Sequence, residues 1–110
     1  MKFKVNAYSL TPLVTVAGVQ GSRGTESLSF DFDSSWDGFA KKVVFFLPDG
    51  TSLIRSYHGG DLMIPKEVLD RRGKSKFVIV GRKGKKRQIT VCASLLVLGT
   101  PLCEETGETL

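Results

Sequence analysis

The chain has 110 residues, of which 41% are hydrophobic and 25% are charged, and its formal net charge is +5. This composition predicts a single globular domain that buries roughly 65% of its unfolded surface, and it argues against intrinsic disorder. No apolar run approaches the ~20 residues of a membrane span, and no signal-peptide core follows Met1. We therefore expect a soluble protein with no membrane partner, whose Cys92 and Cys103 are reduced thiols.

Short strands are predicted in the first part of the chain. Residues 2–9 alternate polar and apolar, which is typical of a half-buried strand. Thr11-Pro12 ends this strand, and residues 13–17 predict a second one. A glycine-rich loop (Gly18, Gly21 and Gly24) leads to residues 27–33, which alternate again.

The segment from 34 to 57 holds the single tryptophan and predicts a turn followed by a hairpin. Residues 34–38 form a turn that presents Trp36, a large apolar side chain with one N–H to satisfy. Residues 42–47 are β-branched and aromatic, residues 48–50 have the composition of a tight turn, and residues 51–57 return antiparallel.

A short helix and further strands are expected in the rest of the chain. Residues 65–73 begin with proline and end with glycine, which predicts a helix of about two turns. The continuous apolar run at 77–81 predicts a central strand buried on both faces. After a basic turn, residues 88–93 pair back, and residues 95–98 extend that strand or start another.

These elements predict an all-β fold, an immunoglobulin-like antiparallel β-sandwich of about seven or eight strands with one short connecting helix. A five-stranded barrel is the competing topology. The sandwich should span residues 1–99, with residues 100–110 as a flexible acidic tail or linker. The expected core residues are Phe30, Phe32, Trp36, Val44, Phe46, Phe77, Ile79, Ile89 and Val91.

No residue pattern predicts catalysis, a cofactor or a metal. The single histidine, His58, lies in a turn, and no Ser or Cys is placed to form a nucleophile–base pair with it. Asp31, Asp33 and Asp37 suggest a calcium cluster, but Trp36 and Lys42 stand where a calcium loop needs Gly and Glu. We expect no catalytic residue, no cofactor and no metal site.

Two surface hypotheses remain open. Residues 66–87 contain ten basic and two acidic residues, a net charge of +8, which leaves −3 for the rest of the chain. This segment would suit nucleic-acid phosphates, although it lacks interleaved exposed aromatics, and a solvated turn is favoured. A sugar platform of Trp36, Tyr57 and His58 is also weighed, with a core role for Trp36 favoured. The candidate interaction residues are Arg82, Lys83, Lys85, Lys86 and Arg87.

The order of motifs resembles the N-terminal β-sandwich domain of siphophage and prophage baseplate upper proteins. The resemblance runs from Ser27 to about Thr106. It rests on the alternating strand before Ser35-Trp36-Asp37-Gly38, on Lys41, Val43 and Phe45 in the next strand, and on the Ile64-to-Leu69 helix. The strands at 78–81, 89–90 and 95–99 complete the order, and the turn at 82–87 is more basic than the resemblance leads us to expect.

The resemblance implies a virion structural protein, made in the bacterial cytoplasm and located in the phage tail. Its partners would be other tail or baseplate proteins, and full-length relatives commonly form trimers. We therefore expect a non-enzymatic assembly or anchoring module. The alternative is a nucleic-acid-binding small β-barrel that uses the basic segment 66–87.

Overall fold

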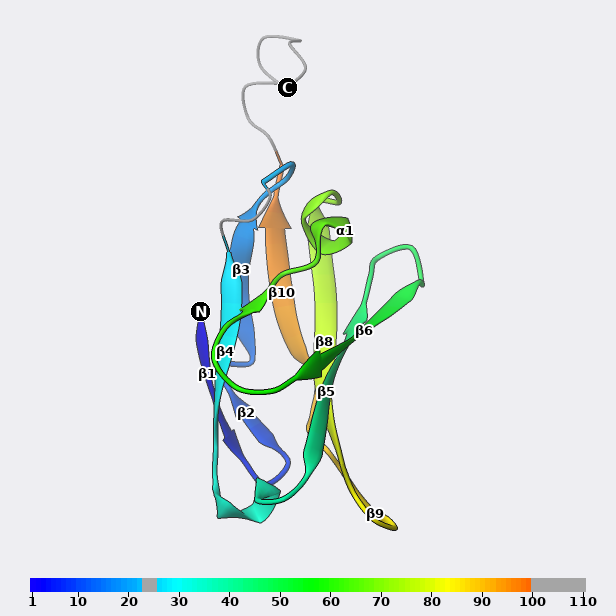
Figure 1. The fold of residues 1–110 in the computed structure, drawn as a ribbon. Helices are drawn as coiled ribbons and strands as arrows, with labels where there is room; N and C mark the ends of the chain where they lie inside the picture. Colours follow the sequence, from blue (N-terminus) through cyan, green and yellow to red (C-terminus); the bar gives the residue numbers. More distant parts are fainter. Residues whose placement is uncertain (23–25, 100–110) are drawn as a thin grey trace, which may run out of the picture.

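The computed structural model describes residues 1–22 and 26–99, which form two β-sheets packed as a sandwich (Figure 1). This confirms the all-β sandwich and disfavours the five-stranded barrel. Gly24 and the tail expected at 100–110 lie outside the described residues.

The smaller sheet has the strand order β2-β1-β4-β7. Its strands are β1 (Lys2–Asn6), β2 (Ser9–Thr11), β4 (Ser27–Phe32) and β7 (Leu62–Met63). β1 runs parallel to β4, with Phe3 opposite Phe30, and the other two pairs are antiparallel.

The larger sheet has the order β3-β10-β8-β5-β6, and β9 pairs with the lower end of β8. Its strands are β3 (Val14–Val19), β5 (Ala40–Phe46), β6 (Ser52–Tyr57), β8 (Gly73–Lys83), β9 (Lys86–Ile89) and β10 (Ala93–Leu98). β3 runs parallel to β10, and the remaining pairs are antiparallel. The long central strand β8 spans most of the sandwich (Figure 1).

The described part of the structure has ten strands rather than seven or eight, because two predicted strands are each divided and the two-residue strand β7 is added. The segment 2–9 turns back at Ala7, whose φ of 51° is left-handed, so β1 and β2 form a hairpin. The segment 88–93 is broken at Thr90, so β9 pairs with β8 while β10 begins at Ala93 and joins a different part of the sheet.

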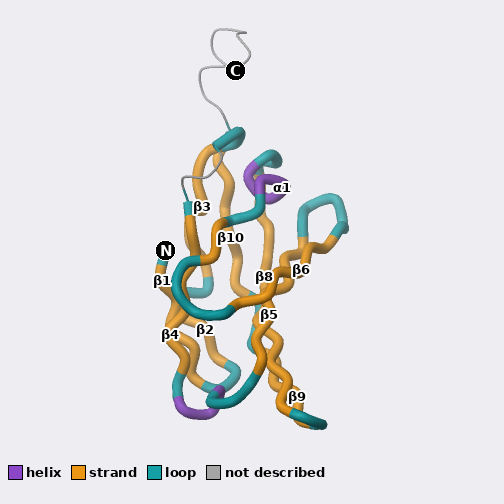
Figure 2. The backbone as a smooth tube through the Cα atoms, in the orientation of Figure 1, coloured by secondary structure: helices purple, strands orange, loops and turns teal. Residues whose placement is uncertain are grey.

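Two short helical segments connect the sheets (Figure 2). The 3-10 helix η1 (Ser34–Trp36) is capped by Asp33, whose side chain accepts from the Ser35 N–H. The helix α1 is only Lys66–Leu69, shorter than the predicted two turns, because the extended strand β8 already begins at Gly73. α1 buries Val68 and Leu69 at one end of the sandwich.

The core lies between the sheets and is rich in aromatic residues. Phe3 of β1 meets Phe77 of β8 edge to face, with ring centroids 5.1 Å apart. Trp36 is fully buried, and its Nε1 donates a 2.9 Å hydrogen bond to the Ala7 carbonyl oxygen. Gly81 allows this packing, since a Cβ there would lie 2.6 Å from Cζ3 of Trp36.

The expected core list is partly correct. Phe30, Trp36, Phe77 and Ile79 are buried, and Phe32 packs partly buried against them. The prediction is wrong for Phe46, Ile89 and Val91, which are exposed, and Val44 is only half-buried.

The physical reason for these errors is strand phase. In β5 the alternation buries Val43 and Phe45 and turns Val44 and Phe46 outward. The strand at 77–81 is central as predicted, but it is not buried on both faces. Phe77 and Ile79 face the core, whereas Val78 and Val80 are half-buried on the opposite face.

Candidate functional site

The outward side of the larger sheet is apolar over most of its length. Strands alternate between two faces, so the residues that alternate with buried ones define one continuous side, which we call the outer face. Ile54 is 57% exposed, Val14 56% and Val16 50%. The apolar residues of the outer face are Val14, Val16, Val19, Val44, Phe46, Ile54, Val78, Val80, Ile89, Leu96 and Leu98.

Strand register assembles these side chains into rows. Val44 lies between Val78 and Ile54, so three aliphatic side chains cross three strands. Leu96 is opposite Val16 at the other side of the sheet, and Ile89 is opposite Val80. Contiguous apolar surface of this kind on a folded domain commonly marks a site of protein interaction.

Cations interrupt the apolar rows. Five cations belong to the outer face, because they either alternate with buried residues along a strand or are paired with an outward residue of the next strand. They are Lys42 of β5, Lys74, Lys76 and Arg82 of β8, and Arg87 of β9. The six strands of this sheet contain no Asp or Glu. The outer face is therefore both apolar and basic.

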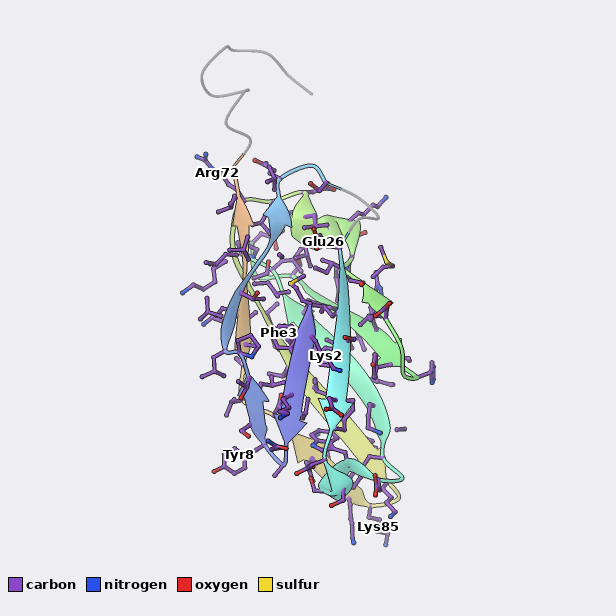
Figure 3. The ribbon with its side chains drawn as sticks, turned by 90° about the vertical axis from the view of Figure 1, so that its left-hand side faces the viewer. Lys2, Phe3, Tyr8, Glu26, Arg72 and Lys85 are labelled. Carbon is purple, nitrogen blue, oxygen red and sulfur yellow. The ribbon has the colours of Figure 1, made fainter. Side chains whose placement is uncertain are left out.

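The structure divides the five candidate interaction residues between two faces. Arg82 of β8 is paired with Arg87 of β9, and both side chains lie on the outer face. Lys83 and Lys86 form the next pair along the hairpin, so their side chains lie on the opposite face. Lys83 packs against Gly38, since a Cβ on Gly38 would be 3.2 Å from its Nζ. Lys85 lies in the turn at the far end of the molecule (Figure 3).

The basic segment 66–87 is accordingly not one patch. It includes α1 and the whole of β8, and Arg72 and Lys85 lie at opposite ends of the sandwich (Figure 3). Around the hairpin turn, a shallow depression of about 410 Å³ is lined by Arg82, Gly84, Lys85, Lys86 and Arg87. The charge of the segment is thus spread along the molecule, with a local concentration at the β8–β9 hairpin.

A second concave region opens between β4 and the β5–β6 pair. It has a volume of about 470 Å³, and Phe30, Phe32, Phe39, Lys41 and Tyr57 are among its lining residues. Lys41 Nζ lies 4.9 Å from the Phe32 ring centroid and donates to the Phe39 carbonyl. These rings and the lysine already contact one another, so the region is the open edge of the core.

The platform of Trp36, Tyr57 and His58 is not assembled. Trp36 is fully buried, and Tyr57 is buried, with its hydroxyl donating to the Gly60 carbonyl and accepting from the Phe30 N–H. His58 is exposed at the rim of the same concave region. The core role favoured for Trp36 is therefore confirmed.

Of the three aspartates near η1, Asp33 has a structural role. Asp33 accepts hydrogen bonds from the Ser35 N–H and hydroxyl and, through Oδ2, from the Ala7 N–H. Asp31 points outward from β4, opposite Lys4. Within residues 1–22 and 26–99, no group of three His, Cys, Asp or Glu residues is placed to hold a metal ion.

Ser75 and Cys92 carry potential nucleophiles in the described part of the chain. The Ser75 hydroxyl is buried and has no hydrogen-bond partner there, so no base activates it. Cys92 is a free, exposed thiol, and Cys103 lies outside the described residues.

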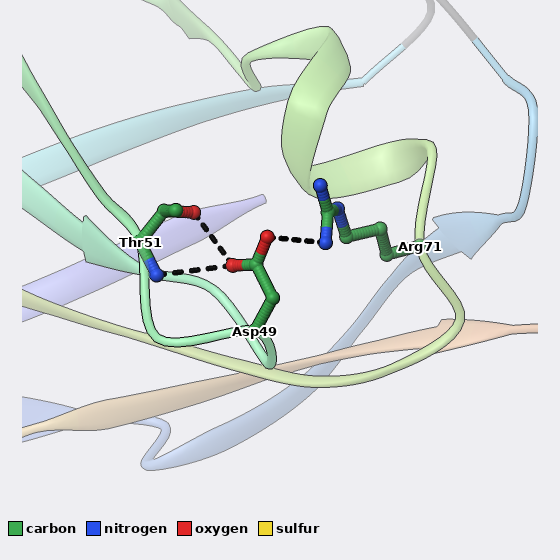
Figure 4. Close-up of polar contacts among 3 residues, drawn as sticks. All are labelled: Asp49, Thr51 and Arg71. Atoms are coloured by element: carbon green, nitrogen blue, oxygen red, sulfur yellow. Dashed lines mark hydrogen bonds and ion pairs between the residues drawn. The ribbon is translucent and has the colours of Figure 1, made fainter.

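The turn between β5 and β6 contains a polar network (Figure 4). Asp49 accepts from the Thr51 hydroxyl at 2.6 Å and from the Thr51 N–H at 3.0 Å, and it pairs with Arg71. The Thr51 hydrogen bonds, and then the Arg71 charge, hold the pKa of Asp49 below its usual 3.8. This network fixes the turn against the segment after α1.

The outer face, with Val16, Ile54 and Leu96, is not among the surfaces expected from the sequence. The available signal was the lack of alternation in residues 43–47, 77–80 and 95–98, because a strand with one solvated face should alternate. The run at 77–80 is expected from sequence to be buried on both faces, whereas among the described residues its outward side, Val78 and Val80, is only half-buried.

Comparison with known proteins gives no family assignment. No family model matches the chain, and no curated protein is significantly similar to it. Among the described residues, no helix is long and apolar enough to cross a membrane.

Proposed function

We propose that the chain is a non-enzymatic assembly module that docks onto another structural protein through the outer face. The observation that carries this proposal is the uncovered apolar surface of the larger sheet, where Ile54, Val16 and Ile89 are 57%, 50% and 44% exposed. Burying exposed apolar surface against a partner is favourable, because it removes that surface from water.

The assembly that we propose is a phage or prophage tail or baseplate. This part of the proposal rests on the resemblance of residues 27–106 to the N-terminal domain of baseplate upper proteins. The β-sandwich fold agrees with it. The partners would be other tail or baseplate proteins, with weak self-association of the isolated chain.

The direct test is mass spectrometry of purified phage particles from an induced lysate of the organism that encodes the chain. We expect the chain in intact particles at a fixed ratio to tail proteins. A matched chain with Ile54→Lys and Val16→Lys should fold but be depleted from particles. Absence of the unmodified chain from particles, with recovery in a cytosolic nucleoprotein complex, would show that the proposal is wrong.

Nucleic-acid binding is the second candidate function, and the β8–β9 hairpin is the observation that favours it. Its depression concentrates four cations within six residues. If phosphates bind there, the affinity for single-stranded DNA should fall linearly with salt on a log–log plot. We expect only weak binding, lost at about 150 mM salt, and micromolar binding at that salt would favour the nucleic-acid function.

A further inference from the structure

The cations of the outer face lack acidic partners among the residues that the structure describes. Lys42, Lys74, Lys76, Arg82 and Arg87 form no ion pair with the described residues. The ion pairs seen there, Arg55–Glu67 and Arg71–Asp49, involve none of these five cations. The outer face therefore presents positive charge that no acidic residue within 1–22 and 26–99 neutralises.

The register of β8 and β9 places like charges directly opposite each other. Arg82 pairs with Arg87, and Lys83 pairs with Lys86. Directly opposed like charges destabilise an antiparallel pair, by an amount comparable to what opposite charges contribute. Arg82 and Arg87 face outward, so an anionic group of a partner could contact both and offset their mutual repulsion.

A second copy of the chain does not suit this face. A two-fold contact sets the same patch against itself, so the five cations of one copy would meet those of the other. Like-charge contact across an interface disfavours association. Closed pairing through the outer face is therefore disfavoured.

Nucleic acid also matches the face less well than a protein does. Phosphates would satisfy the cations, but base stacking needs exposed aromatic rings, and Phe46 is the single aromatic residue on the strands' outward positions. The remaining apolar side chains are aliphatic. A partner protein that presents aliphatic side chains surrounded by carboxylates would complement both the aliphatic residues and the cations of the outer face.

We propose that the outer face is the docking surface for an acidic protein surface that has aliphatic residues at its centre and Asp or Glu around them. This inference rests on the proposed assembly function and names the chemistry of the partner. Val44, Val78 and Ile54 supply the apolar contact. Arg82 and Arg87 bind carboxylates at the hairpin end, and Lys74 does so near the other end of β8.

The test uses soluble probes of defined chemistry and the full chain. An alternating Leu-Glu peptide is compared with an alternating Leu-Lys peptide, with polyglutamate and with oligo-dT, each titrated at low and at about 150 mM salt. We expect the Leu-Glu peptide to bind most tightly and to perturb the amide signals of β5, β8 and β9. The Leu-Lys peptide should not bind.

Matched variants locate the binding. The double variant Arg82→Glu/Arg87→Glu should weaken Leu-Glu binding at least about tenfold, as expected when two charge contacts become repulsive. Ile54→Ser should weaken it without changing its salt dependence. The control Lys2→Glu/Lys4→Glu makes the same charge change on the outward side of β1 and should leave binding within about twofold.

Three results would overturn the inference: equal loss in the β1 control, tighter binding of oligo-dT on the same strands, or a salt-stable dimer formed through this face. Melting curves of every variant show whether a loss of binding reflects a loss of folding. The two proposals also fail separately. If the chain is found in phage particles but the Arg82/Arg87 reversal changes neither incorporation nor peptide binding, the inference fails and the assembly function stands.

Discussion

The two sheets of this sandwich differ in what they present to water. The outward side of β1 carries Lys2, Lys4 and Asn6, and that of β4 carries Ser29 and Asp31. At the outward positions of its strands, the larger sheet presents aliphatic residues and cations. The smaller sheet alternates between a buried and a polar, solvated side, whereas the larger sheet leaves aliphatic residues exposed on its outward side.

Both sheets contribute to one interior, so substitutions there should have the largest effect on stability. Trp36→Ala removes a fully buried indole and its hydrogen bond to Ala7, and we expect a loss of about 3–5 kcal/mol in the free energy of unfolding. Chemical denaturation measures this loss. Tyr8→Ala, at an aromatic residue that is 68% exposed, is the control and should change little. A loss below about 1 kcal/mol for Trp36→Ala would contradict the core assignment.

The inward side of β8 should tolerate no added volume. Gly81→Ala places a methyl group 2.6 Å from the Trp36 ring and 3.2 Å from Phe39 Cβ, so we expect destabilisation by about 1–3 kcal/mol. Lys76→Ala, on the outward side of the same strand, should stay within about 0.5 kcal/mol. Equal losses in the free energy of unfolding for the two substitutions would contradict the assignment of Gly81 to the inward side of β8 and Lys76 to its outward side.

A matched pair of valines compares the two faces of the larger sheet directly. Val43→Thr introduces a hydroxyl at a fully buried position of β5, which should cost about 1–3 kcal/mol. Val16→Thr makes the same change at a position of β3 that is 50% exposed, and it should cost less than about 0.5 kcal/mol. Thermal denaturation of both variants measures the difference, and a costly Val16→Thr would mean that the outer face is buried in the isolated protein.

The smallest expected effect concerns Asp49, away from both faces. Its folded-state pKa is below 3.8, so its contribution to stability is present above that value and is lost as the pH falls through the folded pKa. Asp49→Asn should therefore reduce the loss of stability on acidification. NMR titration of the carboxyl group measures the pKa directly, and a value at or above 3.8 would contradict the Thr51 and Arg71 contacts.

The sequence predicted several elements from alternation or turn chemistry, although the alternating segment 2–9 is a hairpin and not one strand. The strand at 27–33, the turn that presents Trp36 and the hairpin across Asp49-Gly50 are all found. In these segments, the alternation or the turn residues fit only one secondary structure. The sandwich class followed from the number and spacing of such segments.

The errors in strand phase come from the same property that defines the candidate site. In Val43-Val44-Phe45-Phe46, either phase gives an apolar inward face, so the sequence cannot decide which residues are buried. The choice is made by pairing with β6 and β8 and by the position of the smaller sheet, which are long-range contacts. The basic hairpin was identified from sequence, but the division of its cations between two faces depends on register.

The parallel pairing of β3 with β10 has a consequence for the order in which the protein folds. β3 finds its hydrogen-bonding partner about 80 residues later in the chain, with Val14 opposite Ser94. During synthesis from the amino terminus, Val14 and Val16 are therefore exposed without a paired neighbour until the last strand of the sheet is made. Pairings between distant segments form slowly and leave strand edges open to aggregation in the meantime. The final step of folding should accordingly be the closure of the β3–β10 ladder, and truncation before Ala93 should leave a chain that collapses without reaching the sandwich.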